Sequence, residues 1–456
     1  MFRIILFLFP LIKILTYNNA KFQQYVNILT PNLGEYMPYR FQFSSDGNIT
    51  ISLPSVYENY NDAFVRDYTA NPAFRMLEKN NSSPQKLENL PIIYSVMGFS
   101  MDKDNKLYIL DQGIIISSNN SVIDNSSKIV VYTLNQTNSD KVNKTYNFDG
   151  INLTNSLLTD IAVEHSGAYA YIVDSGNLNN NDSIPGIIVV NLEKNKVYKI
   201  LNNDTSFKPP KDENKLNTNK KQRILDYFQN AIGVNCIQIS CNDETIYYSS
   251  IKNTKIFSVS TSDIKKAIKN YENDKSTNKN DILNNIKVNS ADIGFKPENF
   301  VISSKNNIFA LNSELGNVEV SFSIDKDLSS YNRELNTKIN LNEESLNKAF
   351  CLTVCNGSLY VLENFLEDGD DAGNDKAIIY KAEIKNDELN SNIGCSVFIF
   401  KISGGNIFIF VYFFLVLVLT IIIIIANSGD ALEKSKVKKD KEKEANIDEL
   451  NKNLNE

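Results

Sequence analysis

The sequence predicts an all-β protein, a six-bladed β-propeller ectodomain followed by a single transmembrane helix. Three observations support this fold class. A hairpin-like pattern recurs along most of the chain, no long helical pattern separates its copies, and one uncharged apolar stretch of membrane-spanning length lies near the carboxyl end. The chain of 456 residues is long enough for one large all-β domain or for two or three ordinary domains.

The recurring pattern is an alternating apolar run, a polar turn of Asp, Asn, Gly, Ser and Lys, and a second apolar run rich in Tyr. Alternation with a period of two is typical of β-strands, and Asp, Asn and Gly accept the positive φ angles of tight hairpins. Each copy is therefore predicted to be a β-hairpin of half-buried strands. The copies cover residues 40–52, 98–111, 160–174, 235–250, 298–312 and 349–364.

Further strand-like runs lie between the hairpins, at 128–134, 186–201 and 255–260, and the last of these leads into a helical pattern. Four-stranded units that repeat without long intervening helices are typical of propellers. We therefore predict six blades within residues 30–395. A β-sandwich with extra strands is the alternative, but it does not account for the recurring hairpin register.

Both ends of the chain carry targeting signals. Residues 1–20 contain Arg3, a mostly apolar run and small residues closing on Ala20, which predicts a signal peptide, with an uncleaved anchor as the alternative. Residues 406–426 are uncharged and long enough to cross a hydrocarbon core of about 30 Å as a helix. Lysine is abundant in the tail, 427–456, so the positive-inside rule predicts a type I single-pass membrane protein with an extracellular or lumenal ectodomain.

Composition excludes several classes of function. The net charge of −7, with both signs interspersed, argues against a nucleic-acid partner, which would require a basic stripe. The single histidine, His165, excludes zinc sites with several histidines, and we expect it to be exposed in the turn of the third hairpin. Asp111 and Asp174 precede Gly113 and Gly176, a pattern typical of turns. Motifs for phosphate-binding loops, dinucleotide binding or a Ser-His-Asp triad are absent from the sequence.

An ectodomain in an oxidising compartment predicts disulfides and glycosylation. Among five cysteines we expect two disulfides, drawn from Cys236, Cys241, Cys351 and Cys355, with Cys395 beside the membrane as the odd thiol; the sequence leaves the pairing open. The N-x-[ST] sequons, which predict glycosylation, begin at Asn48, Asn80, Asn81, Asn119, Asn125, Asn135, Asn143, Asn152, Asn181, Asn203 and Asn356.

Several stretches carry a resemblance to a known family: KLYILDQG (106–113), LLTDIAVEHSGAYAYIVDSGN (157–177), GIIVVNLEKNKVYKILNNDTSFKPP (186–210), GVNCIQISCNDETIYYSSIKNTKIFSVSTSDI (233–264) and DIGFKPENFVISSKNNIFALN (292–312). In their order and endings they resemble the yellow/major royal jelly protein family over about residues 30–366, with a more distant likeness to gluconolactonase-type propellers. The resemblance implies a six-bladed propeller of the secretory pathway with a ligand pocket at one mouth of the central channel. It also implies links to dopachrome conversion and to binding of biogenic amines.

Polar side chains are predicted to converge where the innermost strand of each blade enters the channel. Aligning the six hairpins places Arg40, Gly98, Asp160, Asn235, Glu298 and Ala349 at equivalent entry positions. Ca²⁺ prefers oxygen ligands and would suit Asp160, Asn235 and Glu298, and the same trio would suit the ammonium of an amine. Arg40 is predicted as a further ligand-binding residue. This trio resembles the acid and amide metal ligands of lactonase-type propellers. The alternative is a structural role, in which inward Asp and Asn satisfy buried backbone groups.

Three functions follow as expectations. The first is binding of a small ligand, an amine among the candidates, or of a protein partner at the channel mouth, without catalysis. The second is an enzyme, either a Ca²⁺-dependent lactonase-like hydrolase or a dopachrome-converting enzyme. The third is a structural or adhesion protein at the surface. The family commonly has Asp-Gly where this chain has Asn235-Cys236 and Glu298-Asn299, and this difference, with the scarcity of histidine, favours binding over catalysis.

Overall fold

The structure, a computed structural model, divides into two units, Met1–Val397 and Phe398–Glu456, and every described residue belongs to the first. The described residues are 23–29, 40–43, 49–52, 74–77, 85–86, 93, 96–102, 104, 106–112, 127–133, 141–153, 156–176, 184–207, 234–250, 253–274, 280–297, 299–302, 307–312, 317–322, 337–340, 349–355, 358–365 and 376–383. The predicted signal peptide, membrane span and tail lie outside them. None of the helices in these ranges is long and apolar enough to span a bilayer.

Within the described ranges, the strands form six antiparallel sheets of four strands each. The first three are β2 (Arg40–Phe43), β3 (Ile49–Ser52), β4 (Phe74–Leu77), β5 (Gln85–Lys86); β6 (Val96–Met101), β7 (Lys106–Asp111), β8 (Lys128–Thr133), β9 (Lys141–Asn147); and β10 (Leu158–Val163), β11 (Tyr169–Asp174), β12 (Gly186–Asn191), β13 (Lys196–Ile200). The last three are β14 (Val234–Ile239), β15 (Thr245–Ser250), β16 (Lys255–Ser260), β17 (Asn289–Asp292); β18 (Asn299–Ile302), β19 (Asn307–Asn312), β20 (Asn317–Phe322), β21 (Thr337–Asn340); and β22 (Ala349–Cys355), β23 (Ser358–Phe365), β24 (Lys376–Glu383) with β1 (Gln23–Leu29).

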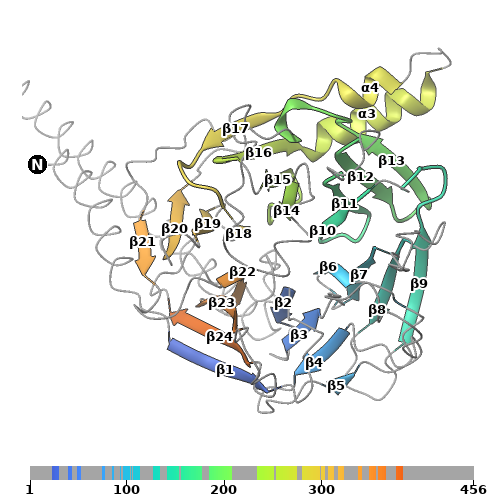
Figure 1. Ribbon diagram of the computed structural model, residues 1–456. Helices are drawn as coiled ribbons and strands as arrows, with labels where there is room; N and C mark the ends of the chain where they lie inside the picture. The colour runs from blue at the N-terminus through green and yellow to red at the C-terminus, as the bar shows by residue number, and fades with distance from the viewer. Residues whose placement is uncertain are drawn as a thin grey trace, which may run out of the picture. The chain divides into compact units, whose positions relative to one another are not determined.

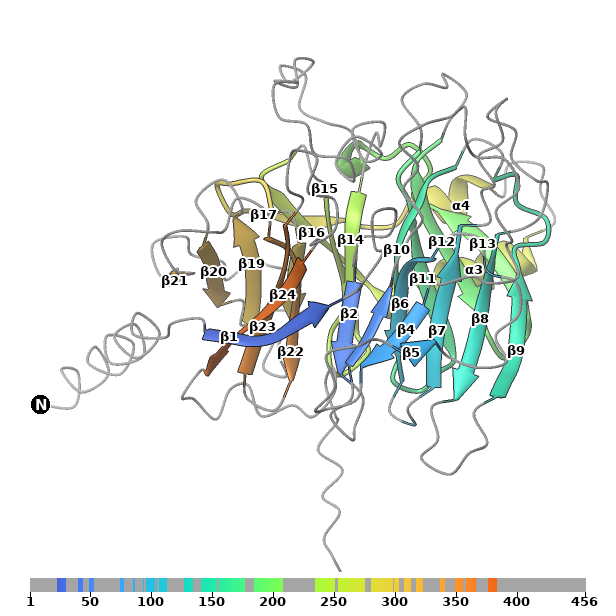
Figure 2. The same ribbon diagram turned by 60° about the horizontal axis from the view of Figure 1, so that its bottom comes forward.

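The sheets are the blades of a ring around a central channel (Figure 1). Their innermost strands β2, β6, β10, β14, β18 and β22 contact one another in this order, and β22 contacts β2. The predicted propeller fold is thus confirmed, and each of the six predicted hairpins pairs as adjacent strands. The sixth blade takes its outermost strand, β1, from the other end of the propeller sequence, because β1 pairs with β24 (Figure 2).

The hydrophobic core lies between neighbouring blades, because each blade is covered on both faces. Residues of β10 and β12 are buried along the whole of each strand, whereas alternation predicted burial on one face only. One cluster joins the third and fourth blades and includes Tyr171, Ile237 and Tyr248, and another joins the second and third blades. Burial on both faces accounts for continuous apolar runs such as IIVV in β12.

Polar residues at the start of the hairpin turns hold the turns by hydrogen bonds. The carboxylate of Asp102 accepts from two backbone N–H groups of its turn at 2.9 Å and from the Tyr108 hydroxyl at 3.1 Å. Glu164 accepts from the Tyr171 hydroxyl at 2.8 Å, and the Ser240 hydroxyl accepts from two turn N–H groups. Burial, with the neighbouring carboxylate, raises the pKa of both tyrosines. The repeated polar turn followed by tyrosine is therefore a structural feature of the blades.

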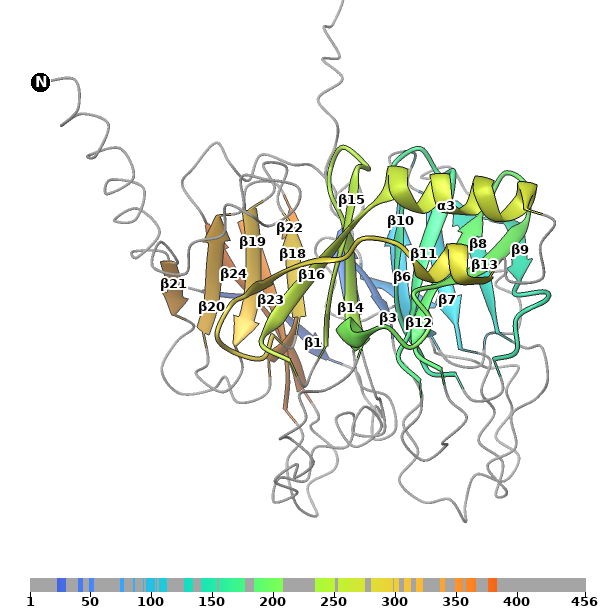
Figure 3. The same cartoon turned by 90° about the horizontal axis from the view of Figure 1, so that it is seen from above.

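The helical pattern after β16 forms α3 (Thr261–Asn273), as predicted. Ser260 is its N-cap, and the side chain accepts a hydrogen bond from a first-turn backbone N–H. The buried face of α3, which includes Ile264 and Ile268, packs into the cluster between the third and fourth blades (Figure 3). A second helix, α4 (Asn280–Asn284), packs against α3. The two helices thus cover the junction between these blades.

Candidate functional site

The first layer of the channel is set by β-bulges at the entry of four innermost strands. The register shifts between Val96 and Gly98, Leu158 and Asp160, Val234 and Cys236, and Ala349 and Cys351. A bulge adds one residue to a strand and changes the direction of the side chains that follow. The resulting ring, called here the first ring, consists of Arg40, Gly98, Asp160, Cys236, Asn299 and Cys351.

The structure brings together only part of the predicted site. Arg40 and Asp160 lie in the first ring and bond to each other. Asn235 is in β14 just before the ring position, and its side chain is not described; Glu298 lies outside the described residues. The ring positions expected for Asn235, Glu298 and Ala349 are instead occupied by Cys236, Asn299 and Cys351.

Arg40 and Asp160 form a buried ion pair between the first and third blades. Nη2 of Arg40 lies 3.1 Å from Oδ2 of Asp160, and the two side chains are 9% and 5% exposed. The carboxylate also accepts from the backbone N–H groups of Ile161 at 3.0 Å and Ile237 at 3.1 Å. A Cβ at Gly98 would lie 3.0 Å from Oδ1 of Asp160, so glycine leaves room for the carboxylate. Burial raises the pKa of Asp160, and the charge of Arg40 and these donors oppose the rise.

This ion pair does not fit the ligands predicted for Asp160. Ca²⁺ takes six to eight oxygen ligands, but one carboxylate oxygen already contacts a guanidinium whose charge repels a divalent cation. An ammonium would have to compete with Arg40 for the same carboxylate. Among the residues that the structure describes, no group of three or more His, Cys, Asp or Glu could hold a metal ion. Asp160 is therefore arranged as the partner of an arginine.

Cys236 and Cys351 are free, buried thiols on either side of Asn299 in the first ring. Asn299 donates from Nδ2 to the sulfur of Cys236 at 3.4 Å and accepts from the backbone N–H of Leu352 at 3.1 Å. The expectation of disulfides at these two cysteines is wrong, because the bulges direct both residues into the channel ring. Burial, with the charge of Asp160, raises the pKa of Cys236 to about 12, and burial also raises the pKa of Cys351. Thiols of this kind are poor nucleophiles.

Cys241, in the turn after β14, is disulfide-bonded. Cys236 and Cys351 are free, so its partner lies outside the described side chains. This disulfide agrees with an oxidising compartment. Of the predicted glycosylation sites, Asn152 and Asn203 have described side chains, and both are exposed. The other sequons lie outside the described side chains.

One layer further along the inner strands, the channel is lined by uncharged groups, called here the second ring. It lies two residues beyond the first ring in each blade and consists of Gln42, Ser100, Ala162, Gln238, Val301 and Thr353. These residues line a cavity of about 110 Å³. Ser100 accepts a hydrogen bond from the backbone N–H of Val163 at 3.2 Å. Within the described chain, the side chains of Gln42, Gln238 and Thr353 make no hydrogen bond. They are polar groups available to an occupant of the cavity.

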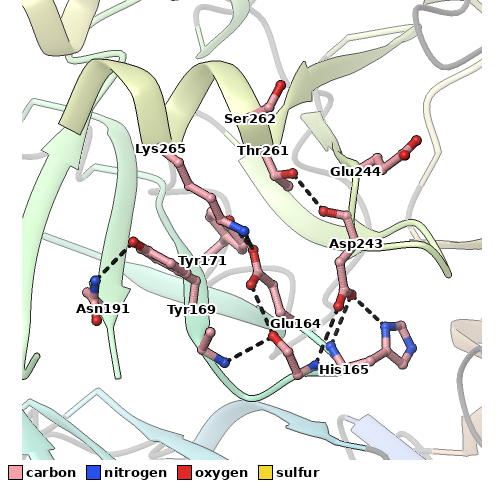
Figure 4. Close-up of polar contacts among 12 residues, drawn as sticks. Glu164, His165, Tyr169, Tyr171, Asn191, Asp243, Glu244, Thr261, Ser262 and Lys265 are labelled. Atoms are coloured by element: carbon pink, nitrogen blue, oxygen red, sulfur yellow. Dashed lines mark hydrogen bonds and ion pairs between the residues drawn. The ribbon is translucent and has the colours of Figure 1, made fainter. Parts of the chain in front are cut away.

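His165 lines the same cavity from the far end of β10. Its side chain is only 9% exposed, and Nδ1 lies 2.6 Å from Oδ1 of Asp243, in the hairpin turn of the fourth blade (Figure 4). The same carboxylate accepts from the backbone N–H of His165 at 3.0 Å. The expectation of an exposed histidine is therefore wrong, because the turns of neighbouring blades pack together. Thr261, at the start of α3, donates to the Asp243 carbonyl at 2.6 Å.

Glu164, next to His165, ties the third blade to α3. Its side chain is 2% exposed and accepts from Tyr171 at 2.8 Å and from Nζ of Lys265 at 2.7 Å (Figure 4). The Lys265 ammonium also lies 4.9 Å from the ring centroid of Tyr169, within cation–π range. All these groups bind one another, so the cluster acts as a clamp between elements.

Asp111 and Asp174 have structural roles, as their position before glycine predicted. Both side chains are fully buried, and each pairs with a lysine of a nearby strand in its own blade. Asp111 lies 2.8 Å from Lys128, and Asp174 lies 2.7 Å from Lys199. Asp174 also accepts from the Ser156 hydroxyl at 2.5 Å. These carboxylates fix the strand ends at the entry face.

Comparison with known proteins identifies the family of this propeller. A family model described as Major royal jelly protein matches residues 94–390, well over half of the chain. The chain belongs to the major royal jelly protein family. The match begins just before β6 and extends past β24, so in this family member it covers the second to fifth blades and strands β22, β23 and β24 of the sixth. No curated protein is similar enough in sequence to count as a relative.

Solved structures with similar chain traces are also propellers. A luciferin-regenerating enzyme has 9% identity and a TM-score of 0.43, covering 80% of this royal jelly family chain and 96% of that protein. A streptogramin B lyase has 15% identity and a TM-score of 0.41, covering 81% and 99% of the two chains. A catalytically inactive virginiamycin B lyase from Staphylococcus aureus, solved with quinupristin, has 10% identity, a TM-score of 0.40 and coverages of 80% and 99%. Similarities at this level do not indicate a shared function.

Proposed function

We propose that this major royal jelly protein family member is a membrane-anchored binding protein that takes a small ligand into its central channel without chemical conversion. One observation carries the proposal. The ion pairs of the channel are satisfied internally, whereas the amides of Gln42 and Gln238 and the hydroxyl of Thr353 have no partner within the described chain. Open hydrogen-bonding groups around a cavity are what a binding site requires.

The charged and nucleophilic groups of the first ring are unsuited to catalysis. A general base must reach a substrate proton in its ionised form, but the Asp160 carboxylate is engaged by Arg40 and two backbone donors. A nucleophilic thiol must ionise near neutral pH, but burial raises the pKa of Cys236 to about 12 and that of Cys351 in the same direction. The first ring is therefore a support for the cavity.

A hydrolase is the second candidate, and the pair of His165 and Asp243 favours it. A carboxylate bonded to Nδ1 orients an imidazole in the way that a general base requires, and His165 lines the cavity. Replacing His165 by Gln would abolish turnover if this pair were catalytic. Two further functions remain as alternatives: binding of a protein partner at the channel mouth, and a structural or adhesive role at the surface. In either case the cavity would bind no small molecule.

Anchoring rests on the uncharged residues 406–426 and the lysine-rich segment that follows. With the predicted signal peptide, 1–20, they support an extracellular or lumenal position of the propeller. An epitope on the tail should remain in the membrane pellet after carbonate extraction. It should be digested by protease added to the cytoplasmic side, whereas the propeller should be protected.

Thermal unfolding of the full chain in detergent tests the binding function. Small amines, small neutral compounds and Ca²⁺ are added separately, and a lactone is assayed for hydrolysis in parallel. A ligand that binds the folded state at one hundred times its Kd should stabilise it by about 2.7 kcal/mol. A shift in midpoint with a small organic compound, without turnover, supports the proposal. Lactone hydrolysis that disappears in His165→Gln, or no shift with any compound, overturns it.

A further inference from the structure

We infer that the channel ligand is a small, electrically neutral molecule or group, recognised through hydrogen bonds by Gln42, Gln238 and Thr353. The inference rests on the proposed binding function and names its ligand class. It differs from the amine that the sequence suggested, because the carboxylate expected to bind an amine is paired with Arg40.

The charged groups of the cavity walls are already engaged, which disfavours a charged occupant. Arg40 offsets Asp160 at one end of the cavity, and at the other end the Asp243 carboxylate is bonded to the backbone N–H and to Nδ1 of His165. The groups between these ends are uncharged. A charged ligand would lose its hydration on entry without gaining a free counter-ion among these walls, which is strongly unfavourable. A neutral ligand does not incur this cost.

The second ring supplies hydrogen bonds from three directions. Gln42 lies in the first blade, Gln238 in the fourth and Thr353 in the sixth, and each side chain has both donor and acceptor capacity. Thr353 is only 9% exposed and lines the cavity. Its hydroxyl has no partner within the described chain, so an occupant of the cavity can bond to it. The ligand must therefore carry both donors and acceptors.

The cavity also limits the size and shape of the ligand. About 110 Å³ is several times the roughly 10–15 Å³ that a cavity needs to hold one water molecule, so the cavity admits a small organic group. Ala162 and Val301 belong to the same ring and stand in the blades next to that of Gln238. A compact molecule with two polar ends and an apolar side fits this wall, either alone or as the terminal group of a larger compound.

Ligand-observed NMR with the purified full chain tests this inference. The neutral probes are glycerol and N-methylacetamide, and the charged probes are propylammonium and propionate, which have similar sizes. Thr353→Val and Gln238→Met remove hydrogen-bonding groups with little change in shape. Thr254→Val, on the half-buried residue before β16, makes the same chemical change away from the cavity and serves as the matched control. Thermal midpoints confirm that each variant is folded.

The expected result is binding of a neutral probe that weakens by about tenfold in Thr353→Val and in Gln238→Met, as the loss of about 1.4 kcal/mol implies. Thr254→Val should bind as the unmodified chain does. Binding of propylammonium or propionate without the neutral probes would overturn the ligand class but not the binding function. Neutral binding unchanged in both channel variants would also overturn the inference. No binding of any probe would overturn the binding function itself.

Discussion

Asp160 depends on the charge of Arg40, which is its partner from two blades away. Replacing Arg40 by Met leaves the buried carboxylate without a counter-ion, and breaking a buried pair in this way costs about 3–5 kcal/mol. Loss of Arg40 removes an influence that lowers the pKa of Asp160, so this pKa, already raised by burial, rises further. A protonated Asp160 is tolerated in the interior without a counter-ion. The loss of stability of Arg40→Met relative to the unmodified chain should therefore be largest at neutral pH and should shrink as the pH falls.

Thermal midpoints of the unmodified chain and of Arg40→Met, measured from neutral to acidic pH, test this expectation. The double variant Arg40→Met with Asp160→Asn serves as the control, since it removes the carboxylate together with its partner. It should be more stable than Arg40→Met alone at neutral pH. A deficit that is independent of pH would contradict the pairing.

The two thiols of the first ring should be inert in the folded protein. Burial raises the pKa of Cys236 to about 12 and raises that of Cys351, so little thiolate forms at pH 8 and reagents have no access. Peptide mapping after iodoacetamide treatment at pH 8 should find both residues unmodified in the native state. It should find both modified in denaturant without a reductant. Modification that requires a reductant would show that they are oxidised.

The sequence predicted Arg40 and Asp160 at the channel but not the other polar members of the first ring. The alignment placed Asn235 one residue ahead of the ring position, whereas it placed Gly98 and Asp160 correctly although both follow a bulge. Counting back from the turn gives Cys236, because four paired residues precede the turn in β14 as they do in β10. The uncharged second ring carries no sequence signal of its own, because Gln42, Gln238 and Thr353 resemble ordinary strand residues.

At the scale of elements, the polar contacts between α3 and the third blade include a buried cluster at Glu164 and a surface cluster at Glu272. Glu164 is 2% exposed and binds Lys265 of α3 and Tyr171, whereas Glu272 of α3 binds Lys196 of β13 at the surface. Glu164→Gln should destabilise the fold by about 1–3 kcal/mol, because it weakens bonds to a buried acceptor. Lys196→Met should cost less than about 1 kcal/mol, as exposed ion pairs do.

Thermal or denaturant unfolding followed by circular dichroism compares the two variants. The order of the two losses is the decisive readout, since both contacts join the same helix to the same blade. Equal losses, or a larger loss in Lys196→Met, would show that the buried cluster is not the main contact between α3 and the third blade.

The existence of α3 was predictable, because a Ser cap precedes a periodic apolar pattern at Ile264 and Ile268. The place where it packs was not predictable. Its partners in the third blade come from earlier in the chain, and local patterning says nothing about which surface an amphipathic helix will cover. The same limit explains why His165 was expected to be exposed, since its cover is a turn of the next blade.

At the scale of the whole propeller, the pairing of β1 with β24 closes the ring. In an antiparallel ladder, neighbouring residues alternate between donating to the partner strand and pointing away from it. Asn27→Pro and Ile28→Pro each remove one backbone N–H from β1, and only one of these N–H groups faces β24. The variant that removes it should lose a hydrogen bond of the ladder, and its free energy of unfolding should fall by about 1 kcal/mol or more. The other variant is its matched control, and thermal unfolding compares them.

Cooperative closure predicts that the damaging proline also speeds hydrogen exchange in β22 and β23, which share the sheet with β1. Protection unchanged there would show that the sixth blade is stable without its outermost strand. Six hairpins were visible in the sequence, and they determined the blades. The closing pair joins segments from opposite ends of the propeller sequence, so no local pattern could have revealed it.

This closure imposes an order of events on synthesis at the ribosome. β1 emerges before every blade, yet its partner is translated only when the chain has grown to Lys376–Glu383. Until then the early blades stack as an open arc whose terminal edges lack neighbours, and such edges are prone to wrong pairing. A nascent chain of this protein therefore exposes these edges until Lys376–Glu383 is made, and a premature stop before β24 would leave β1 without its partner strand.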